Sequence, residues 1–113
     1  MDNRELAILT AKILDEKKAR DLVVLDISEK SGFADYLVIA TAGSQRQMTA
    51  LKGELEDKLA EDGVIFRSVE GRGESGWILL DYGDMIVNIF TEEQREHYQL
   101  EKIWNDCPSI DIN

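Results

Sequence analysis

Apolar residues near the start of the chain recur every three or four positions, which is the spacing of an amphipathic helix. They are Leu6, Leu9, Ile13 and Leu14. Asp2 stands ahead of them as an N-cap, and basic residues after Leu14 complement the negative end of a helix dipole. The pattern predicts a helix over residues 2–19.

Two runs of aliphatic and β-branched residues follow, over residues 22–27 and 36–42. Ser31 and Gly32 interrupt the pattern between them. Runs of this kind, bounded by turn residues, predict strands. Their connection is short enough for a hairpin, so we expect the two strands to be antiparallel neighbours.

A second helical stripe is made of Met48, Leu51, Leu55 and Leu59. Ser44 and Gln47 have the spacing of a capping box, and Gly63 stands where a helix typically ends. The stripe therefore predicts a helix between Ser44 and Gly63.

Three further apolar runs predict strands over residues 64–69, 77–81 and 85–90. A last helix is predicted after Thr91, which repeats the capping box with Gln94. Its apolar face is Leu100, Ile103 and Trp104, and it ends before Pro108. The order αββαβββα indicates an α/β fold of the α+β type, in which helices flank a mixed five-stranded sheet.

Composition narrows the choice of partners. The 113 residues, 43% of them hydrophobic, suffice for one domain over 1–113. The 13 basic and 23 acidic side chains leave a net charge of -10. Binding to phosphates needs clustered Lys and Arg, so we expect little or no direct contact with nucleic acid. A basic protein surface is a better match.

The longest apolar runs fall far short of the roughly 20 residues that a membrane-spanning helix needs. The first residues also lack the pattern of an export signal. We therefore expect a cytoplasmic protein with no membrane partner. Cys107 is the only cysteine, which excludes a disulfide within the chain.

The strongest turn signal is Asp81-Tyr82-Gly83-Asp84, because Gly83 can adopt the positive φ angle of a two-residue hairpin loop. With Tyr82 and Gly83 as the loop, Asp81 faces Asp84, Leu79 faces Ile86 and Trp77 faces Asn88, all on one side of the hairpin. Two facing carboxylates repel each other. Either they bind amides of the turn, or they receive a cation, for which a partner's Lys or Arg suits better than a metal ion.

The run over residues 85–90 is apolar on both sides except for Asn88, which predicts a central, doubly buried strand. Asn88 is then an interior amide. Its simplest role is a structural hydrogen bond beside Trp77, and the alternative is a place in a surface site.

Two nucleotide-binding motifs are matched only in part. Residues 71–76 fit G-x-G-x-x-G but precede a strand rather than a helix, so we interpret them as a surface connection. Gly43-Ser44 is similar to the opening motif of nucleotidyltransferases, but no Asp-x-Asp follows, which favours plain capping. His97 and Cys107 give no sign of a catalytic pair. We expect no catalytic residue, cofactor or metal.

Many positions together resemble the signature of the ribosomal silencing factors, the Iojap-like family. The strongest matches are residues 77–84, Val87, Phe90, Glu93, Arg95, residues 98–101, Trp104 and Asp106. Upstream matches are residues 35–36, 40–41, 44, 46–47 and 69–71. The resemblance covers nearly the whole chain. Two positions depart from it, because the family usually has His at Asn88 and often Thr at Ala34.

The resemblance implies a nucleotidyltransferase-like fold without the catalytic acids, usually as a homodimer. It also implies binding to the universal ribosomal protein fourteen of the large ribosomal subunit. Translation would then be repressed under nutrient limitation by a steric block to joining of the small subunit, without enzymatic activity.

Site residues carried over from the resemblance are Trp77 and Tyr82 as aromatic contacts and Asp81 and Asp84 as partners for Lys or Arg. Tyr98, Glu101 and Trp104 would form the adjoining helix surface, and Trp104 is the first candidate for a core position instead. Two alternatives stay open from the residues alone. One is a small nucleotide-dependent enzyme using Gly43-Ser44 or the glycine loop, and the other is a dimeric adaptor for another basic protein.

Overall fold

The computed structural model describes residues 1–112, apart from the side chains at positions 72 and 73. In chain order the elements are α1 (Asn3–Glu16), β1 (Arg20–Asp26), β2 (Tyr36–Ala42), α2 (Gln45–Glu61), β3 (Ser68–Arg72), a 3-10 turn (Gly73–Ser75), β4 (Trp77–Asp81), β5 (Met85–Thr91), α3 (Glu92–Tyr98) and α4 (Leu100–Ile103). The five strands form one mixed sheet, which confirms the predicted fold class.

The strands lie in the order β1-β2-β5-β4-β3. β1 and β2 pair antiparallel as predicted, and β4 is antiparallel to both β3 and β5. The mixed character comes from β2 and β5, which pair in parallel although α2, β3 and β4 separate them in the chain. β5 is central, and its first six residues are buried, as its unbroken apolar run predicts.

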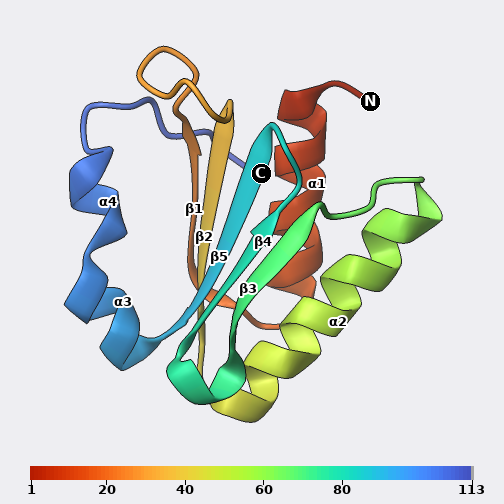
Figure 1. Ribbon diagram of the computed structural model, residues 1–113, viewed down its shortest axis with the longest axis vertical. Helices are drawn as coiled ribbons and strands as arrows, with labels where there is room; N and C mark the ends of the chain where they lie inside the picture. Colours follow the sequence, from red (N-terminus) through yellow and green to blue (C-terminus); the bar gives the residue numbers. More distant parts are fainter. Residues whose placement is uncertain (113) are drawn as a thin grey trace.

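Helices cover the two faces of the sheet unequally. α1 and α2 pack on one face, and the shorter α3 and α4 lie on the other (Figure 1). The larger core cluster, beneath α1 and α2, includes Leu14, Val38, Leu51, Leu55, Leu80 and Val87. The smaller cluster, which Leu100 and Trp104 pack against, includes Leu25, Leu37, Ile39, Ile86 and Phe90. None of the described helices is long and apolar enough to cross a membrane.

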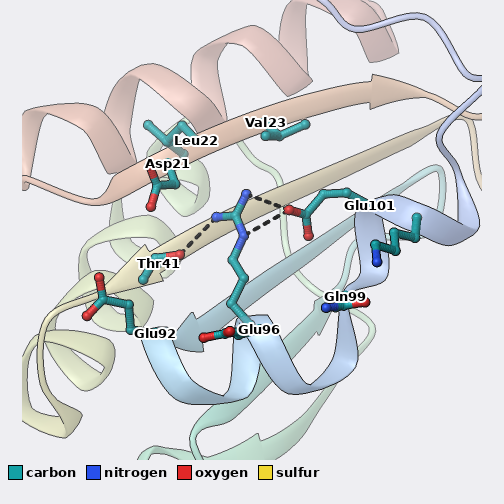
Figure 2. A pocket seen from close by; sticks show the side chains of 10 residues that line it. Asp21, Leu22, Val23, Thr41, Glu92, Glu96, Gln99 and Glu101 are labelled. Carbon is teal, nitrogen blue, oxygen red and sulfur yellow. Dashed lines mark hydrogen bonds and ion pairs between the residues drawn. The ribbon is translucent and has the colours of Figure 1, made fainter.

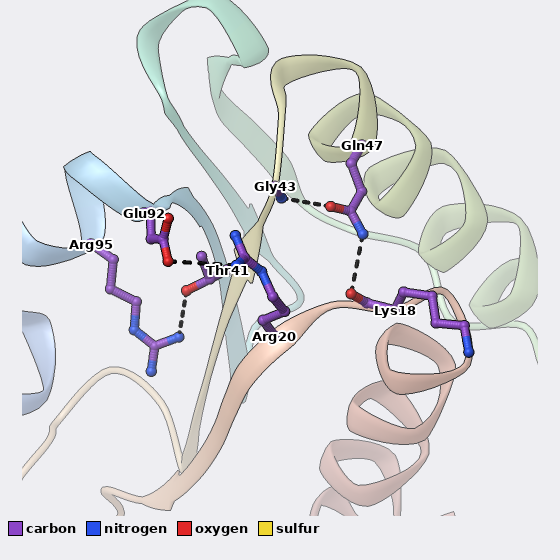
Figure 3. A network of polar contacts seen from close by, with 7 residues as sticks. All are labelled: Lys18, Arg20, Thr41, Gly43, Gln47, Glu92 and Arg95. Atoms are coloured by element: carbon purple, nitrogen blue, oxygen red, sulfur yellow. Dashed lines mark hydrogen bonds and ion pairs between the residues drawn. The ribbon is translucent and has the colours of Figure 1, made fainter.

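The predicted caps hold the helix starts in place. The Asp2 carboxylate accepts the Glu5 N–H at 2.8 Å, and the Ser44 hydroxyl accepts the Gln47 N–H at 3.0 Å. Gln47 does not complete a capping box, because its side-chain oxygen accepts the Gly43 N–H instead. Its amino group donates to the Lys18 carbonyl, so it joins the end of α1 to the start of α2 (Figure 3).

Three predicted boundaries are wrong. The first helix ends at Glu16 rather than near residue 19, and the third strand begins at Ser68 rather than 64. The Val64 N–H donates to the Leu59 carbonyl of α2, so Val64 closes the end of that helix and does not pair in the sheet. The last helix divides at Gln99, whose φ of 47° and ψ of 49° are left-handed. A left-handed residue cannot continue a right-handed helix.

The predicted register of the β4–β5 hairpin is also wrong. The Tyr82 N–H donates to the Met85 carbonyl, so the loop is Gly83 and Asp84. Gly83, with φ of 92°, takes the first loop position, where one class of two-residue loops requires glycine. The facing pairs are Trp77–Phe90, Leu79–Asn88 and Asp81–Ile86, and Asp84 does not face Asp81. The alternation survives this shift, so Trp77, Leu79, Asp81 and Asn88 still share one face.

Candidate partner-binding surface

One half of the sheet stays open on the side of α3 and α4. Alternate residues of β4 point to that side, whereas Ile78 and Leu80 point into the larger core cluster. Glu70 of β3 pairs directly with Leu79 and therefore shares its face. Tyr98, the last residue of α3, completes the surface. We call the surface made by Glu70, Trp77, Leu79, Asp81 and Tyr98 the β4 face.

A stack of aromatic rings forms the centre of the β4 face. The Trp77 ring lies on Phe90, with centroids 5.2 Å apart and planes at 23°. The Tyr98 ring lies 4.7 Å from that of Trp77. Phe90 is fully buried, Trp77 is half-buried, and Tyr98 is 46% exposed. The stack thus runs from the core to the surface and fixes the outer rings on a rigid base.

Asn88 holds the polar edge of Trp77. The indole Nε1–H donates to Asn88 Oδ1 at 2.9 Å, and Asn88 is 1% exposed. The predicted interior amide beside Trp77 is confirmed. Its amino group, Asn88 Nδ2, is buried without a hydrogen-bond partner among the described residues.

A shallow hollow of about 240 Å³ opens beside these rings. It is lined by Glu70, Gly71, Ser75, Trp77, Leu79 and Tyr98. Gly71 has a φ of 82°, and a Cβ there would lie 2.1 Å from the Trp77 carbonyl oxygen, so only glycine fits. The result is an apolar hollow with one carboxylate, that of Glu70, at its edge.

The two aspartates at the hairpin have different roles. Asp81 Oδ1 accepts the Gly83 N–H at 2.7 Å, so Asp81 binds an amide of the turn, the first of the two roles considered from the sequence. Asp84 is exposed at the tip, and its backbone carbonyl accepts the N–H groups of Asp35 and Tyr36. The Arg67 guanidinium lies against Gly83, within 3.1 Å of where a Cβ would stand. A cation of the same chain therefore already neighbours the turn.

Tyr82 lies on the other side of the sheet. It packs against the larger core cluster, and its ring meets that of Phe66 edge-on at 6.3 Å. Burial, with a smaller contribution from the Glu56 carboxylate, raises the pKa of the Tyr82 phenol to about 12. The structure therefore does not bring Tyr82 together with Trp77.

Glu101 and Trp104 lie beyond the β4 face. Glu101 borders a hollow of about 630 Å³ between β1 and the last two helices, where its carboxylate pairs with Arg95 at 3.3 Å (Figure 2). Arg95 also donates to Thr41 Oγ1 at 2.9 Å. Trp104 packs against the smaller core cluster and meets Phe33 edge-on. Of the predicted set, the structure brings together Trp77, Tyr98 and, along the strand, Asp81.

Neither nucleotide motif forms an open phosphate site. The Gly43 N–H, which would have to meet a phosphate, is taken up by Gln47 at 2.5 Å. Residues 71–76 form the end of β3, the 3-10 turn and the residue before β4. They do not begin an α-helix, whose N-terminus a phosphate would need. Within residues 1–112 no group of three His, Cys, Asp or Glu side chains could hold a metal ion.

A family model described as "Ribosomal silencing factor during starvation" matches residues 1–113. The chain belongs to the ribosomal silencing factor family. It is 34% identical to the ribosomal silencing factor of Bacillus subtilis over 113 residues, which cover 100% of this chain and 96% of that protein. A mouse protein named mitochondrial assembly of ribosomal large subunit protein 1 is 29% identical over 101 residues, covering 85% of this chain and 43% of the mouse protein.

A solved structure supports the same assignment. The crystal structure of protein CV0518 from Chromobacterium violaceum superposes with a TM-score of 0.89 and 31% identity, covering 93% of this chain and 88% of the other. The family resemblance seen in the sequence is thus confirmed. The silencing factor family is defined by regulation, and its name describes no catalysed reaction.

Sequence reasoning missed two residues of the β4 face and one bond at the neighbouring hollow. Leu79 could have been included, because strand alternation already placed it beside Trp77. Glu70 enters through the register of β3 against β4, which no local pattern encodes. The bond between Arg95 and Thr41 joins residues 54 positions apart, and no sequence signal announces it.

Proposed function

We propose that this silencing factor is a non-enzymatic regulator that binds the large ribosomal subunit through the β4 face. The partner there would be the universal ribosomal protein fourteen, and the bound protein would stop the small subunit from joining. Family membership and the name of the mouse relative support the ribosomal part of this proposal. The observation that carries the site is the preorganised pair of Trp77 and Tyr98 on an uncovered part of the sheet.

The chemistry of the β4 face suits a basic protein partner. Aromatic anchors beside charged groups are typical of the residues that dominate binding energy in interfaces. The rings of Trp77 and Tyr98 are held by Phe90, so little conformational freedom is lost on binding. Glu70, with the exposed Asp84 at the hairpin tip, offers carboxylates to Lys or Arg. The net charge of -10 attracts a basic ribosomal protein and keeps the chain away from rRNA phosphates.

The mechanism needs only occupancy. Surface that the silencing factor covers cannot form bridges to the small subunit, so translation falls without any chemical step. A complex of standard size involves about 20–30 residues on each partner, more than the residues that define the β4 face, so the interface would extend to neighbouring residues. Following the family resemblance, we propose a cytoplasmic homodimer that acts when nutrients are short.

Co-sedimentation with purified large subunits tests the proposed site. The unchanged protein should co-sediment at micromolar concentration, and Tyr98→Ala should weaken binding about tenfold or more because it removes an exposed anchor. Ile65→Ala is the matched control, since Ile65 is an apolar residue, 66% exposed, outside the β4 face. Absence of co-sedimentation by the unchanged protein would reject the function, and equal losses in both variants would reject the site.

A further inference from the structure

Strand β5 carries one polar residue in its buried stretch. Asn88 lies between Ile39 of β2 and Leu79 of β4, and it is 1% exposed. Every other residue from Met85 to Phe90 is apolar. Burying an amide in such a place disfavours folding unless the amide is fully hydrogen-bonded. Its presence therefore needs an explanation.

The bond to Trp77 fixes which way this amide points. An indole N–H can only donate, so it must meet the oxygen of Asn88, at 2.9 Å. The amino group is then turned away from the indole. It is buried with no partner among the described residues. The amide satisfies Trp77 while staying half-satisfied itself, which is a poor arrangement for a residue whose only task is stability.

We infer that Asn88 is a positioning residue of the β4 face, which it serves by holding the Trp77 indole with its N–H turned inward. This inference rests on the proposed function. Because the indole N–H of Trp77 is bonded to the buried Asn88, the part of the Trp77 ring that lines the hollow beside Leu79 and Tyr98 carries no free donor. Without that acceptor the indole N–H turns toward water, and a partner meets a displaced, hydrated ring.

A double-mutant cycle separates this role from a purely structural one. Asn88→Leu is close in volume and removes the acceptor, and Trp77→Phe removes the donor. Asn88→Leu alone should weaken binding to isolated large subunits about fivefold to tenfold. In the Trp77→Phe background it should cause no further loss, because the interaction through which it acts is gone. An equal loss in both backgrounds would overturn the inference.

Hydrogen exchange of the indole protons gives a readout independent of the ribosome. The chain has two tryptophans, and Trp104→Phe assigns their indole signals in a ¹⁵N spectrum. The Trp77 indole proton should exchange slowly in the unchanged protein and at least about tenfold faster in Asn88→Leu, whose thermal unfolding stays cooperative. Unchanged exchange of that proton in Asn88→Leu would contradict the inference.

The binding measurements and the hydrogen-exchange measurement together distinguish failure of the inference from failure of the proposed function. If the unchanged protein fails to bind large subunits, the proposed function fails and takes the binding role of Asn88 with it. If the unchanged protein binds, and Asn88→Leu releases the indole without weakening binding, the proposed function stands and the inference is wrong.

Discussion

At the scale of single residues, the turn of the β4–β5 hairpin shows how far local chemistry predicts structure. The sequence correctly placed a glycine turn between Asp81 and Met85. Both Tyr82-Gly83 and Gly83-Asp84 satisfy the need for a positive φ at Gly83, and local rules do not choose between them. The choice follows from packing, because Tyr82 has to reach the larger core cluster.

The two aspartates should therefore differ in stability. Asp81→Ala removes the acceptor of the Gly83 N–H and should lower the free energy of unfolding by about 1 kcal/mol. Asp84→Ala should change it by less than about 0.5 kcal/mol, since that side chain is exposed. Urea unfolding of both variants measures the difference. Equal stability of the two would show that the Asp81 bond contributes nothing.

The observed hairpin register also decides what charge reversal at the two aspartates should do. Because Asp81 and Asp84 do not face each other, Asp81→Lys relieves no repulsion and should destabilise the turn. Asp84→Lys keeps the turn and should weaken binding to large subunits. Binding by Asp84→Lys at the level of the unchanged protein would remove Asp84 from the interface.

Tyr82 gives a prediction about alkaline pH. The pKa of its phenol is about 12 in the folded protein, against 10.0 ordinarily, because burial disfavours the phenolate. A raised pKa means that the unfolded chain releases the proton first. The contribution of the protonated Tyr82 phenol to the free energy of unfolding is complete below pH 10 and is lost as pH rises toward about 12. Unfolding measured from pH 9 to 12 should show a smaller decline in Tyr82→Phe than in the unchanged protein, and identical declines would contradict this.

At the scale of elements, the long periodic segments were predicted well and the chain end was not. The stripe from Met48 to Leu59 and the caps at Asp2 and Ser44 are local signals, and the structure has them as expected. The break at Gln99 has no such signal, because the apolar period continues through Leu100 and beyond. The turn there lets α4 pack on the sheet while Glu101 meets Arg95, which are long-range demands.

Gln99 should be a site where glycine stabilises the protein. Its φ of 47° places a side chain in a region that disfavours every residue with a Cβ. Gln99→Gly should raise the free energy of unfolding by about 0.5–1 kcal/mol. Glu96→Gly, at an exposed position within α3, is the opposite control and should lower it by about 1 kcal/mol. Thermal unfolding of both variants shows whether each is more or less stable than the unchanged protein. A less stable Gln99→Gly would contradict the claim that the backbone at Gln99 is strained.

At the scale of the whole molecule, the parallel pairing of β2 with β5 could not be predicted from local patterns. It creates the central strand and leaves β4 and β3 on one side of it, where α3 reaches β4 through the contact of Tyr98 with Trp77. The β4 face is a consequence of this topology. The sequence predicted its aromatic residues through family resemblance, but only the folded structure shows that the rings of Trp77 and Tyr98 meet while Tyr82 packs against the larger core cluster.

The net charge of -10 should appear in the kinetics of binding. Attraction between an acidic protein and a basic ribosomal protein speeds encounter and is screened by salt. The association rate constant for the isolated basic ribosomal protein should fall roughly tenfold or more when ionic strength rises from about 0.05 to 0.5 M, with a smaller change in dissociation. Stopped-flow or surface-based binding measures both. An association rate constant that rises or stays constant with salt would show that electrostatic attraction does not speed the encounter.

The central claim is that the β4 face blocks subunit joining by occupying the large subunit. The most direct measurement is light scattering of purified large and small subunits as they associate. At a concentration equal to its Kd, the unchanged protein should block about half of the association, and Ile65→Ala should do the same. At that concentration Tyr98→Ala, which binds about tenfold more weakly, should block about a tenth or less. Full association in the presence of saturating unchanged protein, or equal inhibition by Tyr98→Ala, would contradict the account.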